Sequence, residues 1–154
     1  MDYHAETGLA SKEQSITHRS QMGRELKKKI RDRSAKLGVV GLGYVGLPLA
    51  LEMARAGFEV TGIDLVRERV DSINSGISYI PDVTGEALLS AVSANRLRAT
   101  QSLSAAEKVD TLNICVPTPL RKNKDPDLSY VIAAVEAIRT CLLYTSDAAT
   151  TSRV

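Results

Sequence analysis

Three glycines and one acidic residue have the types and the spacing to hold an anion beside a sugar. Gly41, Gly43 and Gly46 follow the pattern G-x-G-x-x-G, and Asp64 comes 18 residues after the last of them. The first glycine permits a tight turn, the second leaves bare backbone for a pyrophosphate, and the third lets the next helix pack closely. The N-terminus of that helix would present unpaired N–H groups and the positive end of its macrodipole. The spacing therefore predicts an anion site closed on one side by a carboxylate.

The elements around these residues form a strand–turn–helix–strand unit. An apolar strand over residues 37–40 precedes the first glycine, a helix of small residues follows over 47–56, and a strand over 58–63 ends at Asp64. This order is typical of a dinucleotide site in which the acid accepts hydrogen bonds from the adenosine ribose. The acid favours NAD over NADP, because it would repel a 2′-phosphate, and the next residues, Leu65 and Val66, offer that phosphate no cation.

A nucleoside ligand such as S-adenosylmethionine is the alternative within the same fold. It gains little from this motif, because it has no pyrophosphate to use the third glycine and the helix N-terminus.

A further strand is expected over residues 109–116, and it runs directly into Pro117, Thr118 and Pro119. Open α/β sheets place ligand contacts outside the carboxyl ends of their strands. The prolines restrict the turn, so we expect Pro117 and the Thr118 hydroxyl to form a wall for the nicotinamide half of the cofactor. The alternative is a proline loop that only ends the strand.

The rest of the pattern predicts helices over residues 67–74, 85–93 and 128–139, and a short strand over 97–99. Thr84 is expected to cap the second of these helices, and Ser104, with Glu107 three residues later, to cap another. The fold class is therefore α/β, a Rossmann-type doubly wound parallel sheet that is truncated after about three main strands. The residues expected to face inward from the later helices are Leu88, Leu89, Val92, Val131, Ala134, Val135 and Ile138.

Composition and charge exclude several classes of protein. The 154 residues are 44% hydrophobic and 25% charged, which suits one domain with its own core. Residues 1–36 hold nine Lys or Arg against five Asp or Glu, but the signs are interleaved and Tyr3 is the only aromatic there, so no nucleic-acid partner is expected. The sequence has no apolar run of about 18 residues and no signal peptide, so we expect a cytoplasmic protein without membrane contact. Cys115 and Cys141 have no metal-ligand spacing, so no metal is expected.

The chain is expected to fall into four segments. Residues 1–21 are polar and aperiodic and are interpreted as a disordered arm, and residues 22–35 as an amphipathic helix. Residues 36–140 are the incomplete NAD-binding domain. Residues 141–154 have no strand or helix period, and their CLLYTSDAA stretch resembles the translation of a transposase end sequence used in preparing sequencing libraries. We expect them to be a non-native tail; a native disordered tail is the alternative.

Three separated motifs carry a family resemblance: GLGYVGLPLALEMARAGFEVTGID, SYIPDV and ICVPTPLRKNKDPDLSYV. Over residues 26–140 the chain resembles the N-terminal domain of the UDP-glucose/GDP-mannose dehydrogenase family, most closely its bacterial UDP-N-acetylglucosamine or N-acetylmannosamine 6-dehydrogenases. The resemblance implies an oxidoreductase of polysaccharide biosynthesis, a homo-oligomer, that oxidises the C6 hydroxyl of a UDP-sugar to a carboxylate with two NAD, through a thioester on a cysteine. It implies an NAD site made of Gly41, Gly43, Tyr44, Val45, Gly46 and Asp64, with Thr118 near the cofactor.

The family's catalytic cysteine, its dimerisation helix and its UDP-binding domain have no counterpart in this sequence, so no catalytic residue is assigned. Cys115 precedes the cofactor turn and is not the nucleophile, and His4 and His18 lie in the polar arm. We expect an NAD-binding fragment that is inactive alone, with the UDP-sugar bound by the missing domain. One alternative is a stand-alone NAD-binding or interaction module without catalysis. Another, a hydroxyacid-type Rossmann dehydrogenase, is disfavoured by the stretch PTPLRKNKDPD.

Overall fold

The computed structural model describes residues 21–150, and side chains as far as residue 142. The chain divides into two compact units, residues 1–35 and 36–154. In the first unit, residues 21–31 form a helix, close to the predicted 22–35. The helix ends where Arg33 takes a left-handed φ of 63° and the N–H groups of Ser34 and Ala35 both donate to the carbonyl of Lys29. Nearly all of the predicted arm, residues 1–20, lies outside the described residues.

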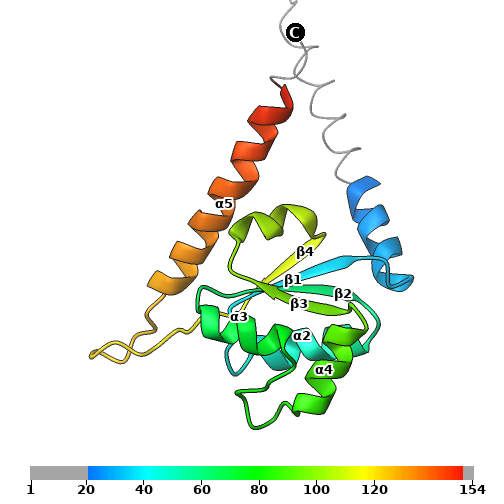
Figure 1. The fold of residues 1–154 in the computed structure, drawn as a ribbon. Coiled ribbons are helices and arrows are strands. Elements are labelled where there is room, and N and C mark those ends of the chain that lie inside the picture. Colours follow the sequence, from blue (N-terminus) through cyan, green and yellow to red (C-terminus); the bar gives the residue numbers. More distant parts are fainter. Residues whose placement is uncertain (1–20, 151–154) are drawn as a thin grey trace, which may run out of the picture. The chain divides into compact units, whose positions relative to one another are not determined.

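The second unit is built on a parallel sheet of four strands in the order β3-β2-β1-β4 (Figure 1). The strands are β1 (Lys36–Val40), β2 (Glu59–Ile63), β3 (Leu97–Thr100) and β4 (Thr111–Ile114). The order reverses beside β1, since β2 and β3 lie on one side of it and β4 on the other. This arrangement confirms the predicted α/β doubly wound class.

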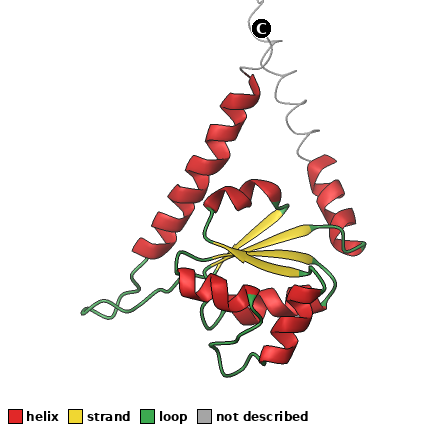
Figure 2. Ribbon diagram, in the orientation of Figure 1, coloured by secondary structure: helices red, strands yellow, loops and turns green. Residues whose placement is uncertain are grey.

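Helices cover both faces of this sheet (Figure 2). On one face lie α2 (Gly46–Arg55), α3 (Arg67–Asn74) and α4 (Gly85–Ser93). On the other lie the short 3₁₀ helix η1 (Leu103–Lys108) and α5 (Ser129–Thr150). The central strands are therefore buried on both sides, which explains why they read as continuous apolar runs rather than as alternating ones.

The core has one cluster on each face of the sheet. On the face of α2, α3 and α4, the fully buried side chains include Leu47, Ile73 and Leu88. On the opposite face, Val40, Ile63, Ala106 and Ile138 pack together. Ile138 comes from α5 and Ala106 from η1, so these two helices share one small core with β1 and β2.

The predicted strand over residues 109–116 is shorter in the structure. Only Thr111–Ile114 is strand, and its pairing with β1 runs from Leu37 with Thr111 to Val40 with Ile114. At the start, Asp110 is bonded to Lys36 twice, since its N–H donates to the carbonyl of Lys36 at 2.8 Å and its carboxylate accepts from the N–H of Lys36 at 2.8 Å.

One predicted helix cap is confirmed and another is wrong. The Thr84 hydroxyl accepts a hydrogen bond from the N–H of Ala87 at 3.3 Å, as expected for the cap of α4. The capping box of Ser104 and Glu107 does not form. The six-residue 3₁₀ helix instead begins after Ser102, and the hydroxyls of Ser102 and Ser104 are bonded to each other at 2.7 Å. The Ser104 hydroxyl thus has another partner.

Two residues expected to face inward are exposed. Leu89 is 52% exposed and lies beside Gly76, while Leu88 and Ala91 are the buried residues of α4. Val135 is 46% exposed, because α5 packs on η1 and none of the described elements covers its other side.

The expectation that no helix period follows residue 140 is also wrong. No glycine or proline interrupts the chain from Ser129 to Thr150, and α5 continues to Thr150.

Candidate nucleotide-binding site

The glycine loop, residues 41–46, lies at the carboxyl end of β1, where the order of the sheet reverses. The N–H of Gly41 donates to the carbonyl of Ile63 at 2.8 Å, which ties the loop to the end of β2. Gly41 has a φ of 88°, and a Cβ built on it would lie 2.6 Å from the carbonyl oxygen of Cys115. A Cβ on Gly46 would overlap the carbonyl oxygen of Gly41. Both positions therefore require glycine, the first for the turn and the other for the close approach of α2.

The loop presents backbone N–H groups that have no partner among the described residues. Among the residues that the structure describes, no atom accepts a hydrogen bond from the N–H of Gly43, Tyr44, Val45 or Gly46. A Cβ built on Gly43 would meet no atom within 4 Å, so the space beside its backbone is open. The side chains of Tyr44 and Val45 point to solvent. Four adjacent free donors at the N-terminus of α2 suit an anion with several oxygens, such as a pyrophosphate.

Asp64 closes this site from the end of β2. Its side chain is only 6% exposed, and it is one of two buried polar or charged residues among those described. One carboxylate oxygen accepts from the N–H of Leu42 at 2.8 Å, and the other from the N–H of Val66 at 2.9 Å. Asp64 thus holds the glycine loop in place through Leu42, a structural role that the sequence did not indicate.

Two further residues reach this site, and the sequence analysis missed both. The guanidinium of Arg69, in the first turn of α3, lies 3.3 Å from the carboxylate of Asp64. It also lies 6.0 Å from the centre of the Tyr79 ring. Arg69 could have been found, since a helix that starts just after Asp64 brings its first turn back to the strand end. The contact of Tyr79 with the loop, described below, has no sequence signal.

A cleft of about 480 Å³ opens beside Asp64 at the carboxyl ends of the strands. Its walls come from the glycine loop, the ends of β2 and β4, and one face of α5. It is largely apolar, with the carboxylate and the guanidinium as its charged groups, which suits a flat heteroaromatic ring joined to a polar sugar. The lining residues are Val40, Gly41, Ile63, Asp64, Leu65, Val66, Arg69, Leu103, Val116, Pro117, Tyr130, Ala133, Ala134 and Ala137.

The structure thus brings the predicted Gly41, Asp64 and Pro117 to one cleft. The predicted residues from Gly43 to Gly46, whose N–H groups are free, follow in the same loop but do not line the cleft. Thr118 is exposed and does not line the cleft. Cys115 is half-buried, and this burial raises the pKa of its thiol.

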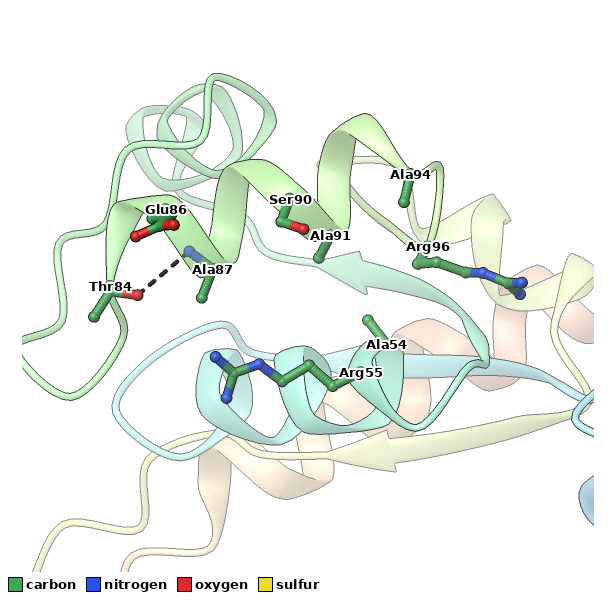
Figure 3. A pocket seen from close by; sticks show the side chains of 9 residues that line it. All are labelled: Ala54, Arg55, Thr84, Glu86, Ala87, Ser90, Ala91, Ala94 and Arg96. Carbon is green, nitrogen blue, oxygen red and sulfur yellow. Dashed lines mark hydrogen bonds between the residues drawn. The ribbon is translucent and has the colours of Figure 1, made fainter.

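A second hollow of about 380 Å³ lies between α2 and α4 and contains none of the predicted site residues (Figure 3). Four of its nine lining residues are alanines. Its two cations are already engaged, since Arg55 pairs with Glu52 and Arg96 donates to the carbonyl of Gly57 at 2.8 Å. No group of three metal-ligating side chains occurs within the described part of the chain. Among the described residues, the polar groups that suit a ligand therefore lie at the glycine loop and the cleft.

A family model describing the NAD binding domain of the UDP-glucose/GDP-mannose dehydrogenase family matches residues 35–147. The chain belongs to this family. The matched residues include every site residue discussed above, and the cofactor of this domain is NAD.

Relatives in the UDP-glucose/GDP-mannose dehydrogenase family match the same region. An NDP-N-acetyl-D-galactosaminuronic acid dehydrogenase from Ralstonia nicotianae is 45% identical over 107 residues, which are 69% of this chain and 25% of that protein. A UDP-N-acetyl-D-mannosamine dehydrogenase from Methanococcus maripaludis is 41% identical over 108 residues, 67% of this chain and 25% of that protein. The solved GDP-mannose dehydrogenase of Pseudomonas aeruginosa superposes with a TM-score of 0.63 at 35% identity, over 66% of this chain and 24% of that one.

The chain therefore spans about a quarter of the length of the family relatives that it matches. It corresponds to their NAD-binding domain. Within the described residues, no helix has the length and apolar character needed to cross a membrane.

Proposed function

We propose that this chain is the NAD-binding part of a nucleotide-sugar 6-dehydrogenase. The observation that carries the proposal is the row of four free N–H groups, from Gly43 to Gly46, beside the buried carboxylate of Asp64. A pyrophosphate needs several hydrogen-bond donors, whereas a ribose diol needs an acceptor. The loop and the end of β2 offer these two surfaces next to each other.

Different residues of the described chain would bind different parts of NAD. The N–H groups of Gly43, Tyr44, Val45 and Gly46 would bind the pyrophosphate, and Asp64 the adenosine ribose. NAD, when bound, supplies the acceptor for the hydride that leaves the carbon carrying the alcohol. We assign Pro117 and Thr118, which follow β4, to the nicotinamide side of the site, because ligands of open α/β sheets lie outside the carboxyl ends of the strands.

The substrate proposed for the complete protein is a UDP-linked N-acetylhexosamine, oxidised at C6 with two NAD. The names of the relatives from Ralstonia nicotianae and Methanococcus maripaludis support this class of sugar. We further propose a cytoplasmic homo-oligomer, in which residues 36–140 form the cofactor domain and residues 141–154 are not native to it. The sugar and the catalytic cysteine would belong to the part of the protein outside this chain.

Calorimetric titration of the chain with NAD, NADP and ADP-ribose tests the cofactor assignment. We expect NAD and ADP-ribose to bind with similar affinity, because the loop and Asp64 contact only the ADP-ribose half, and NADP to bind more weakly. If NADP binds as tightly as NAD, the assignment of Asp64 to the ribose is wrong. Incubating the complete protein with NAD and UDP-N-acetylmannosamine or UDP-N-acetylglucosamine should give two NADH per sugar; one NADH per sugar would contradict oxidation to the acid.

A further inference from the structure

Leu42, the residue between the first two glycines of the loop, is held on three sides. Its N–H donates to the carboxylate of Asp64 at 2.8 Å, and its carbonyl oxygen accepts a hydrogen bond from the Tyr79 hydroxyl at 2.6 Å. Its side chain is fully buried and sits over Gly62 of β2, where a Cβ would come within 2.7 Å of it. Both polar groups of one loop residue are thus fixed by side chains from elsewhere in the chain.

The peptide group that joins Leu42 to Gly43 connects this contact to the anion site. The described residues have no cis peptide bond, so the carbonyl of Leu42 and the N–H of Gly43 point in opposite directions from one rigid plane. Tyr79 holds the carbonyl on one side. The Gly43 N–H must then point away from Tyr79, and it is the first of the four N–H groups that have no acceptor among the described residues.

We propose that Tyr79 is a positioning residue for cofactor binding, which fixes the Leu42–Gly43 peptide so that the Gly43 N–H faces the pyrophosphate of NAD. The inference rests on the proposed function of the glycine loop. It gives the Tyr79 hydroxyl a part in cofactor binding.

The segment that carries Tyr79 is anchored well enough for this role. The next residue, Ile80, is buried, as is Val83. The Arg69 guanidinium lies 6.0 Å from the centre of the Tyr79 ring. Burial, together with the negative charge of Asp64, raises the pKa of Tyr79 to about 12, so its hydroxyl remains a donor throughout the neutral range.

Replacing Tyr79 by Phe removes the hydroxyl and keeps the ring, so the packing of the segment is preserved. The matched control is Ser78→Ala, which removes a hydroxyl-to-carbonyl hydrogen bond from the neighbouring residue without touching Leu42. The two ligands to compare are NAD and adenosine. Adenosine has the ribose but no phosphate, so a change confined to the anion site should not affect it.

We expect Tyr79→Phe to raise the Kd for NAD roughly three- to tenfold, the effect of one lost hydrogen bond, with the Kd for adenosine unchanged. Ser78→Ala should leave both Kd values unchanged, and all three proteins should melt cooperatively. Three results would overturn the positioning role and leave the proposed function standing. Tyr79→Phe could bind NAD as tightly as wild type, or lose the same affinity for adenosine as for NAD. Ser78→Ala could also raise the Kd for NAD as much as Tyr79→Phe does. A wild-type chain that does not bind NAD would overturn the proposed function and this inference with it.

Discussion

The guanidinium of Arg69 lies 3.3 Å from the carboxylate of Asp64, so a cation lies directly beside the acid that we propose binds the ribose. The acid is buried and the cation is partly exposed. In dinucleotide-binding folds, an acid at this place favours NAD and a nearby arginine can accommodate the 2′-phosphate of NADP. We therefore expect the preference for NAD over NADP to depend on two opposing effects on the 2′-phosphate, its repulsion by the Asp64 carboxylate and its attraction to the Arg69 guanidinium.

Replacing Asp64 by Asn should therefore change cofactor preference as well as affinity. Asn keeps an oxygen of the right size but loses the charge, so NAD binding should weaken by about 1–3 kcal/mol, the range of hydrogen bonds to charged groups. NADP should bind better relative to NAD, because Arg69 is released and the repulsion of the 2′-phosphate is gone. Calorimetric titrations of both proteins with both cofactors measure the ratio.

The control for Asp64→Asn is Asp71→Asn. It removes a carboxylate from α3, the helix that carries Arg69, where Asp71 pairs with Arg67 at 3.5 Å on the exposed side. The control should leave both affinities unchanged. If the ratio of the NAD and NADP affinities is the same in Asp64→Asn as in wild type, Arg69 does not act on the cofactor's 2′ position.

The second and third glycines of the loop should respond differently to the same substitution. Gly43→Ala puts a methyl group into open space, and the φ of Gly43 is not in the left-handed region, so the melting temperature should stay close to that of wild type. NAD affinity should still fall at least tenfold, because the methyl group occupies the space proposed for the pyrophosphate.

Gly46→Ala should lower both stability and NAD affinity. Its methyl group overlaps the carbonyl oxygen of Gly41, so either α2 or the loop must shift. Overpacking of this kind typically costs about 1–3 kcal/mol. Thermal melts and NAD titrations of the two alanine variants check the difference, and a Gly43→Ala protein that binds NAD normally would remove Gly43 from the pyrophosphate site.

The sequence was sufficient to predict the parts of the site that follow from local pattern. The glycine spacing, the apolar strands around it and the acid at the end of β2 all lie within one strand–turn–helix–strand unit, where chain order fixes spatial order. Arg69 and Tyr79 were missed because their contacts depend on how α3 and residues 77–83 fold back on the loop. Leu89 and Val135 were misplaced because an apolar residue in a short or one-sided helix faces inward only if a neighbouring element covers it.

Asp127 should give the start of α5 a stability that depends on pH. The backbone N–H of Ser129, and then Arg121, hold the pKa of Asp127 at about 2. The pKa in an unfolded chain is about 3.9, so the folded state favours the carboxylate. Its stabilising contribution is therefore complete above about pH 4 and is lost as the pH falls through about 2.

Thermal melts of wild type and Asp127→Asn between pH 2 and 7 measure this contribution. The melting temperatures should differ by a constant amount above about pH 4, and the difference should shrink as the pH falls toward about 2. Asp125→Asn is the control, since it removes a charge from the same loop without touching Ser129. A difference that stays constant from pH 7 to 2 would show that the Asp127 charge does not stabilise α5.

The chain should self-associate through the side of the sheet where β4 lies. Among the described strands β4 is an edge strand, paired only with β1, and unpaired edges promote association. On α5, Ile132 and Val135 are exposed on the same side of the helix as Leu128, at the i, i+4 and i+7 spacing of one face. Exposed apolar surface of this kind also promotes association.

Sedimentation velocity over a range of concentrations should therefore show oligomers of the wild-type chain. The double variant Ile132→Lys/Val135→Lys should shift the distribution toward monomer, with a change in stability within about 0.5 kcal/mol, because both side chains are exposed. Ile77→Lys is the control, since Ile77 is also exposed but lies in the link between α3 and α4. A wild-type chain that stays monomeric at every concentration, or an Ile77→Lys variant that acts as strongly as the double variant, would show that the α5 face does not drive association.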